Sequence, residues 1–276
     1  MFEGSKYAYY GMYLVGFAIM MLVNLKTYKR YELTKKTAVI FTLITYVAGV
    51  YGASMMGNMY SSAILKYGGT NSSVAIFGAV VFTPIIMTAV SLLANKPWRK
   101  VMDLLAPGIF IILTCAKFGC FMAGCCVGRE CSFGIYNPEY EATLFPSQLF
   151  ESITMCFVVA FCFWFGFRNK RFKSGSLYPI TAAVYSVTRF CWEFMRYYPN
   201  DEIRYIMFGL TFWQFWCLVT IVISAVWLLL LRSHKLIIIE KKYNDFYLDV
   251  KTKLLNRTKK DIVHHNSNKK KYQKKK

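Results

Sequence analysis

Histidine and charged residues are scarce in this sequence. Only three histidines occur among 276 residues, and all three, His234, His264 and His265, lie near the C-terminus. Charged residues make up 17% of the chain, whereas about a quarter is usual for a soluble domain. The composition therefore excludes an ordinary soluble globular protein. It also leaves the first 233 residues without a histidine that could act as a general base.

Nine cysteines are present, but no two of them have the C-x-x-C spacing of common zinc sites. Four of them crowd one segment: Cys120, Cys125, Cys126 and Cys131. Two alternatives are open for this group, a disulfide among the last three or free structural thiols, and we expect neither a metal nor a cofactor. The other five fall within apolar runs and resemble small apolar residues.

Long apolar runs dominate the sequence, of which 56% is hydrophobic. Each run has about 17 to 25 residues, enough to cross a bilayer as a helix, and none alternates at period two as a barrel strand does. Backbone in lipid must satisfy its own hydrogen bonds, so these runs are helices. We predict an all-α membrane protein with seven spans, at 8–25, 38–56, 73–94, 104–123, 149–167, 176–196 and 207–231. The first run lacks a basic lead-in and a small-x-small cleavage site, so we expect a membrane helix rather than a cleavable signal.

Basic residues alternate between the connections of these spans. The connections after the first, third and fifth spans hold most of them: Lys26, Lys29, Arg30, Lys35, Lys36, Lys96, Arg99, Lys100, Arg168, Lys170, Arg171 and Lys173. The other connections hold only Lys66, Arg129, Arg196 and Arg204. Cytoplasmic loops carry the excess of Lys and Arg. We therefore expect the N-terminus outside the cell and the C-terminus in the cytoplasm.

About half of the net charge of +20 comes from the C-terminal tail. From residue 233 onward the tail holds 13 Lys and one Arg against four acidic residues. We predict a seven-helix membrane domain over 1–232 and a basic cytoplasmic tail over 233–276. Such a tail is attracted to anionic lipid of the inner leaflet, and its amphipathic stretch Leu236–Leu255 is expected on the membrane surface. We expect no binding to nucleic acid.

The sixth predicted span carries the most polar residues. Tyr185, Arg189, Glu193 and Arg196 follow one another at spacings of four, four and three, which places them on one helix face. Ionised groups inside a membrane are costly unless they are paired or hydrated. A structural Arg189–Glu193 pair is one interpretation. Tyr185 and Arg196 extend the face beyond a single pair, which indicates a functional site.

A long external connection, 124–148, separates the fourth and fifth spans. Connections of this length usually carry function. Small residues near it let a helix or a lipid headgroup approach the backbone, and cations suit an anionic ligand. The candidate residues in and beside it are Lys117, Gly119, Gly128, Arg129, Gln148 and Glu151.

Six motifs occur in order along the chain: Tyr9–Phe17 around Tyr10-Gly11, Asp103–Pro107, Gly119 with Gly128-Arg129, Pro146–Glu151, Tyr185-x-x-x-Arg189-x-x-x-Glu193-x-x-Arg196, and Gln214 near the start of the last span. Together they resemble the motifs of bacterial prolipoprotein diacylglyceryl transferases, over about residues 8–230. One such match is weak. Six in order, on the expected faces and side of the membrane, are specific.

The sequence departs from the family signature mainly at polar positions. Where the family has Arg, two Asn and Glu, this chain has Lys117, Cys120, Ala123 and Cys125. Phe145 stands where the family has His, and Phe77-Gly78-Ala79 aligns with its His-Gly-Gly loop. The motifs therefore indicate membership of the family more directly than they indicate its reaction.

The resemblance implies transfer of diacylglyceryl from phosphatidylglycerol to the lipobox cysteine thiol of a preprolipoprotein signal peptide. The reaction would take place at the outer leaflet of a bacterial cell membrane. The implied catalytic residues are Arg189, Glu193, Arg129 and Tyr185. The implied substrate-binding residues are Tyr10, Lys117, Gly119, Gly128, Gln148, Glu151, Arg196 and Gln214.

Two other functions are open. One is a phospholipid-dependent transferase of the same fold that modifies another acceptor. The other is a non-catalytic, lipid-binding relative. A channel or transporter is disfavoured, because the polar residues gather at one side of the membrane and do not line a path across it.

Overall fold

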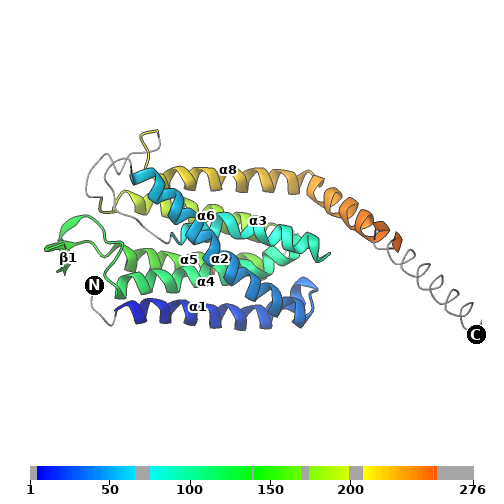
Figure 1. Ribbon diagram of the computed structural model, residues 1–276, viewed down its shortest axis with the longest axis horizontal. Coiled ribbons are helices and arrows are strands. Elements are labelled where there is room, and N and C mark those ends of the chain that lie inside the picture. Colours follow the sequence, from blue (N-terminus) through cyan, green and yellow to red (C-terminus); the bar gives the residue numbers. More distant parts are fainter. Residues whose placement is uncertain are drawn as a thin grey trace, which may run out of the picture. The chain divides into compact units, whose positions relative to one another are not determined.

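The computed structural model describes residues 5–65, 75–138, 140–168, 174–198, 208–250 and 252–253. Within them, a helix lies at each of the seven ranges predicted as spans (Figure 1). They are α1 (Ser5–Thr27), α2 (Lys35–Ile64), α3 (Phe77–Leu93), α4 (Trp98–Met122), α5 (Ser147–Arg168), α6 (Leu177–Glu193) and α8 (Phe212–Arg232). A short 3-10 helix, Tyr28–Tyr31, joins α1 to α2, and two strands, β1 (Glu130–Asn137) and β2 (Ala142–Leu144), connect α4 to α5.

Five of the described helices are long and apolar enough to cross a membrane: Tyr7–Tyr31, Lys35–Ile64, Trp98–Met122, Ser147–Arg168 and Phe212–Arg232. The shorter helix α3 is also apolar, with 17 residues. α6 has 17 residues as well and carries the charged Arg189 and Glu193. The predicted class, a helical membrane protein, is confirmed.

Apart from shifts at other helix ends, such as the start of α4 at Trp98 instead of 104, three features differ from the prediction. α2 continues to Ile64, well past the expected end at 56, because Gly57 and Ser61 are buried and packing overrides the low helix propensity there. α6 ends at Glu193, because Arg196 lies in a β-bridge with Gly128. The external connection 124–148 contains the β1–β2 hairpin, which the sequence analysis did not predict. The first residues of the predicted spans 73–94 and 207–231 lie outside the described residues.

Helix α4 forms the centre of the membrane unit. Every residue from Val101 to Ile111 is buried, and the helix contacts α1, α2, α3, α5 and α6. A helix that is apolar and buried on all sides is typical of the core of a helix assembly. α4 therefore sets the positions of the helices around it.

The start of α6 is anchored to α4 through Asp103. The Asp103 carboxylate accepts hydrogen bonds from the backbone N–H groups of Gly175, at 2.5 Å, and Leu177, at 3.0 Å. A carboxylate satisfies donors that a helix N-terminus leaves unpaired and interacts favourably with its dipole. This contact fixes one end of α6, and the charged residues described below lie near its other end.

The hairpin ties three helix ends together. β1 and β2 are antiparallel, with Asn137 opposite Ala142. At its base, the backbone N–H of Gly128 donates to the carbonyl of Phe145 at 2.8 Å, and that of Arg129 donates to the carbonyl of Met195 at 2.9 Å. The ends of α4, α5 and α6 are therefore joined by backbone hydrogen bonds.

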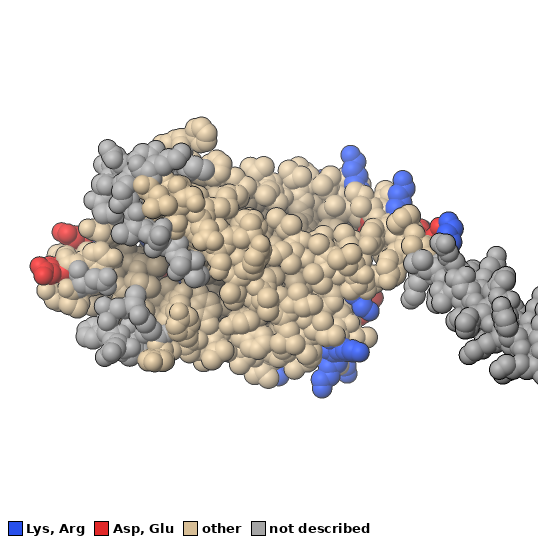
Figure 2. All heavy atoms as spheres, in the orientation of Figure 1, with Lys and Arg blue, Asp and Glu red and all other residues tan. Residues whose placement is uncertain are grey.

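Basic residues lie at the opposite end of these helices. Figure 2 shows Lys and Arg side chains at the end of the helices away from β1. The described basic residues of the α1–α2 and α3–α4 connections and the end of α5 belong to this end: Lys26, Lys29, Arg30, Lys35, Lys36, Lys96, Arg99, Lys100 and Arg168. Lys66, Lys170, Arg171, Lys173 and Arg204 lie outside the described residues.

The contacts divide the chain into two compact units, Met1–Leu229 and Leu230–Lys276. In the second unit, residues 235–250 are helical. This helix exposes apolar side chains, among them Ile239, Phe246 and Leu248, together with Lys241 and Lys242. The Lys-rich end of the tail, 254–276, lies outside the described residues.

Helices α2 and α3 approach closely at Gly52 and Gly78. A Cβ placed on Gly78 would lie 2.1 Å from the carbonyl oxygen of Gly52 and 2.6 Å from Cβ of Met56. Small residues at such crossings let two membrane helices pack backbone to backbone. A side chain at position 78 would force the helices apart.

We therefore expect Gly78→Ala to destabilise the protein by about 1–3 kcal/mol, the usual cost of overpacking. Thermal unfolding in detergent measures the change. Gly11→Ala is the matched control, because nothing lies within 4 Å of a Cβ at Gly11. Equal unfolding temperatures for the two variants would contradict the close packing at Gly78.

Candidate active site

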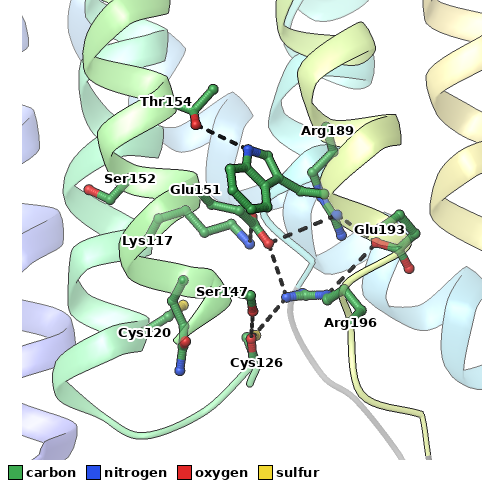
Figure 3. Close-up of polar contacts among 12 residues, drawn as sticks. Lys117, Cys120, Cys126, Ser147, Glu151, Ser152, Thr154, Arg189, Glu193 and Arg196 are labelled. Carbon is green, nitrogen blue, oxygen red and sulfur yellow. Dashed lines mark hydrogen bonds and ion pairs between the residues drawn. The ribbon is translucent and has the colours of Figure 1, made fainter. Parts of the chain in front are cut away.

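Charged side chains from three helices meet at the hairpin end of the molecule (Figure 3). α4 contributes Lys117, α5 contributes Glu151, and α6 contributes Arg189 and Glu193, while Arg196 reaches in from beyond the end of α6. We call these five residues the charged cluster. All are largely buried, and the most exposed, Arg196, keeps only 12% of its side-chain surface accessible.

Glu151 is the centre of the charged cluster. Its Oε2 lies 2.5 Å from Nζ of Lys117, and its Oε1 lies 3.4 Å from Nη1 of Arg196 and 4.0 Å from Nη1 of Arg189. One carboxylate on α5 thus pairs with a cation from α4 and two cations from the α6 region. It links three helices that are separate in the sequence.

Glu193 holds the two arginines from the other side. Its Oε2 lies 2.5 Å from Nη1 of Arg189, one helical turn earlier, and 3.8 Å from Nε of Arg196. The hydroxyl of Tyr198 donates a hydrogen bond to its Oε1. Each arginine therefore lies between two carboxylates, which restricts its orientation.

The charged cluster has an excess of positive charge. It contains three cations and two carboxylates, so one positive charge is not neutralised by its members. Taking an ion out of water costs several kcal/mol unless a partner compensates it. Guanidinium groups donate to phosphate oxygens in a planar fork, and a Lys ammonium adds a point charge. The arrangement is suited to one bound anion, such as a phosphate diester.

The turn after α4 is held against the charged cluster by hydrogen bonds to its backbone. Ser147 Oγ and Arg196 Nη1 donate to the carbonyl of Cys126, at 2.9 Å and 3.2 Å. Gln148 Nε2 donates to the carbonyl of Cys125 at 2.7 Å. The start of α5 and Arg196 thereby set the path of this turn.

All nine cysteines lie in the described part of the chain and are free thiols, so the disulfide alternative is not realised in the structure. Hydrogen bonds from the thiols of Cys120 and Cys125 lower the pKa of the Cys126 thiol well below its usual value, and the positive charges of Arg196 and Lys117 add to this effect.

The structure brings together five of the predicted site residues, which are the members of the charged cluster. Gln148 lies next to them and holds the turn after α4. Tyr185 lies on α6 one turn before Arg189, and its ring is buried, 5.6 Å from the ring of Phe77 and 5.8 Å from that of Phe110.

The other predicted residues lie at the edge of the charged cluster, apart from it, or have structural contacts. Arg129 is exposed and lines a hollow together with Arg196 and Tyr198. Tyr10 is 65% exposed on α1. Gly119 and Gly128 are close-packed. A Cβ on Gly119 would lie 3.2 Å from Cβ of Met12, and a Cβ on Gly128 would lie 2.8 Å from the carbonyl oxygen of Phe145.

Gln214 forms a capping box at the start of α8. Its Oε1 accepts a hydrogen bond from the backbone N–H of Thr211, and the Thr211 hydroxyl accepts one from the N–H of Gln214, both at 3.1 Å. This reciprocal pair satisfies two donors at a helix N-terminus.

Sequence reasoning missed Tyr198 and the pair Tyr9–Tyr13. Tyr198 follows the end of α6, so helical periodicity does not connect it with Glu193. The hydroxyls of Tyr9 and Tyr13 lie 3.0 Å apart on α1. Their spacing of four residues, about one helical turn, indicates that the two side chains are neighbours. The motif around Tyr10 led instead to the prediction of Tyr10 as the site residue.

Loss of Glu151 tests whether the charged cluster is held by its central carboxylate. We expect Glu151→Gln to destabilise the protein by about 3–5 kcal/mol, because it leaves buried cations without their partner. Added inorganic phosphate should recover part of this loss by binding to the extra positive charge.

Thermal unfolding in detergent, with and without phosphate, measures both effects. Glu141→Gln, on the exposed turn of the hairpin, is the matched control. A Glu151→Gln variant as stable as this control would show that Glu151 does not hold the charged cluster.

Comparison with known proteins gives a consistent family. The profile of the prolipoprotein diacylglyceryl transferase family matches residues 3–230. A phosphatidylglycerol–prolipoprotein diacylglyceryl transferase of Clostridium perfringens is 28% identical over 176 residues, which cover 59% of this chain and 68% of that protein. A second such transferase, of Clostridium tetani, is 29% identical over 159 residues, which cover 53% of this chain and 61% of that protein. A third, of Polaromonas naphthalenivorans, is 27% identical over 147 residues, which cover 51% of this chain and 53% of that protein. The matches thus span about half to two thirds of these relatives. The chain belongs to the prolipoprotein diacylglyceryl transferase family.

Proposed function

We propose that this protein transfers diacylglyceryl from phosphatidylglycerol to the lipobox cysteine thiol of a preprolipoprotein at the outer leaflet of a bacterial cell membrane. The relatives that it matches are named for this substrate pair. The observation that carries the proposal is the charged cluster, a buried group of three cations and two carboxylates at one end of the helices. A phosphatidylglycerol headgroup is an anion of the kind that it fits.

The proposed topology has seven spans, with the N-terminus outside. Two observations support it. α3 and α6, with 17 residues each, are about 26 Å long at 1.5 Å per residue, close to the thickness of the hydrocarbon core. The described basic connections lie away from the hairpin (Figure 2), as expected of a cytoplasmic end. This orientation places the charged cluster near the outer surface and the basic tail beside anionic lipid of the inner leaflet, where its exposed apolar and basic side chains suit an interface.

In the proposed reaction, the acceptor thiolate attacks the glycerol carbon that carries the phosphate ester. A carbon–sulfur bond forms, the carbon–oxygen bond breaks, and the electron pair leaves with glycerol phosphate. Arg189, Arg196 and Lys117 stabilise the negative charge that develops on the leaving phosphate. Because all three are already oriented by Glu151 and Glu193, little reorganisation is needed.

The proton of the acceptor thiol must also be removed. No histidine lies in the part of the sequence that forms this site, and both carboxylates are engaged in ion pairs. We assign the proton to the phosphate of the substrate, which becomes a monoester as glycerol phosphate leaves. Glu193 then orients Arg189 and does not act as the base.

An apolar hollow beside the charged cluster suits the acceptor peptide. It has a volume of about 390 Å³ and is lined by residues that include Met122, Leu144 and Phe145. Gln148 also lines it, is 2% exposed, and its Oε1 has no hydrogen-bond partner among the described residues. A buried unpaired acceptor is costly, so a backbone N–H of an extended peptide would stabilise it.

One observation favours a second function, a transferase of the same fold with another acceptor. Phe145, which stands where the family has His, is stacked 4.9 Å from the ring of Phe150 and 6.2 Å from that of Trp192. An aromatic stack replaces a polar side chain beside the proposed acceptor site. The experiments below separate the two functions.

Substitution of Arg189 tests the role of the charged cluster. We expect Arg189→Ala to lower the rate of glycerol phosphate release from phosphatidylglycerol by about 10²–10³-fold, as loss of a transition-state donor does elsewhere. Arg189→Lys should recover only part, because an ammonium lacks the fork. Lys100→Ala, an exposed ion-pair partner of Glu32, is the control.

The decisive experiment is complementation of a transferase-depleted bacterium, scored by lipidation of a reporter prolipoprotein. Lipidation that depends on Arg189 would support the proposed function. Glycerol phosphate release without lipidation would instead indicate another acceptor. If a normally inserted protein shows no lipidation and no glycerol phosphate release, it is a non-catalytic relative.

Filling the apolar hollow tests the acceptor site. We expect Met122→Trp to raise KM for the acceptor peptide several-fold and to leave KM for phosphatidylglycerol unchanged. Met59→Trp, on the exposed surface of α2, is the matched control. Equal effects on both KM values would place the acceptor elsewhere.

A further inference from the structure

Three thiols converge at the end of α4. The Sγ atoms of Cys120, Cys125 and Cys126 all lie within 4.8 Å of one another. Cys120 is buried, Cys125 is partly buried and Cys126 is exposed. We call these residues the thiol triad.

A tight turn creates the thiol triad from residues whose spacing alone does not predict it. α4 ends at Met122, and the backbone then passes through left-handed conformations at Gly124, with φ of 68°, and at Cys126, with φ of 62°. The backbone N–H of Cys125 donates to the carbonyl of Cys120 at 3.2 Å. The chain therefore folds back over the last turn of α4. This brings the thiols of Cys125 and Cys126 next to the thiol of Cys120.

Contacts from other elements hold this turn in place. Ser147 and Arg196 both donate to the carbonyl of Cys126, and Gln148 donates to the carbonyl of Cys125. These groups come from the start of α5 and from beyond α6, so the turn does not depend on its own hydrogen bonds alone for its shape. These contacts hold the three thiols close together.

We propose that the thiol triad binds a thiophilic d10 metal ion, Zn²⁺ or Cu⁺. Soft thiolate ligands select these ions. At a Zn–S distance of about 2.3 Å, three sulfurs on a tetrahedral ion lie about 3.8 Å apart. Three thiols already within 4.8 Å of one another need only small movements to reach this geometry. The exposed Cys126 provides the route of entry, and the fourth position of a zinc ion remains open to water.

The charge around the thiol triad favours this occupant. Three thiolates exceed the charge of either ion, and Arg196, within 3.2 Å of the Cys126 carbonyl, and the nearby Lys117 offset that excess. Zinc sites of the usual kind combine two C-x-x-C or His pairs. This one uses a C-x4-C-C segment closed by tertiary contacts.

Metal titration of the full-length, reduced protein in detergent tests the proposal, which does not depend on the transfer activity. We expect one Zn²⁺ or one Cu⁺ per chain, measured by competition with a chromophoric chelator for each ion. Cys126→Ser should lower the affinity by more than about 100-fold, because even loss of an outer-shell partner costs about 10–100-fold. Cys156→Ser and Cys191→Ser, at exposed cysteines on α5 and α6, are the matched controls.

X-ray absorption of the metal-loaded protein provides a second readout that does not require a variant to fold. Three sulfur ligands on the bound ion are expected, with one lighter ligand for Zn²⁺ and none for Cu⁺. A bound ion with fewer than three sulfurs would mean that other groups, such as the histidines near the C-terminus, hold it, and would overturn the proposal. Unchanged binding by Cys126→Ser, or no binding while the three thiols react with a thiol reagent, would overturn it as well.

Discussion

The ion pairs of Glu151 are the interaction on which the rest of the site depends. A single carboxylate on α5 approaches Lys117 of α4 and the two arginines of the α6 region. Each of these cations is costly to bury alone. Together with Glu193 they form a group that holds three helix ends at fixed distances and keeps one positive charge in excess. The same contacts that allow the helices to pack with charged residues in them therefore also give the proposed phosphate site its charge.

The backbone around this group has a matching role. The hairpin base, the turn after α4 and the segment after α6 are connected by hydrogen bonds of Gly128, Arg129 and Cys126 with residues of the neighbouring elements. At the other end, Asp103 anchors the start of α6. Because α6 is held at both ends, Arg189 and Glu193 have little freedom to shift. Such preorganisation is what electrostatic stabilisation of a leaving phosphate requires.

The two proposals place two kinds of ligand at this end of the protein. The charged cluster suits a phosphate, and the thiol triad beside it suits a soft cation. They share Arg196, which contacts Glu151, Glu193 and the carbonyl of Cys126. Two of the three cysteines, Cys120 and Cys125, stand where the family signature has Asn and Glu, which are poorer ligands than thiolates for soft metal ions. The chain has thus replaced part of the family's polar site by thiols and by Lys117, and it has kept Arg189, Arg196 and the central carboxylate.

Local features of the sequence determined the helical class, the positions of the seven helices and the grouping of Arg189 with Glu193, because apolar run length and helical periodicity depend only on neighbouring residues. The motif resemblance identified the family, and the matched profile confirms it. Tertiary structure alone decided which residues meet across helices. It paired Glu151 with Lys117, brought Cys120 together with Cys125 and Cys126, used Gln214 as a cap for α8 and left Tyr10 exposed. The path of the turns decides these contacts, and that path depends on backbone hydrogen bonds between segments far apart in the chain, which no local pattern records.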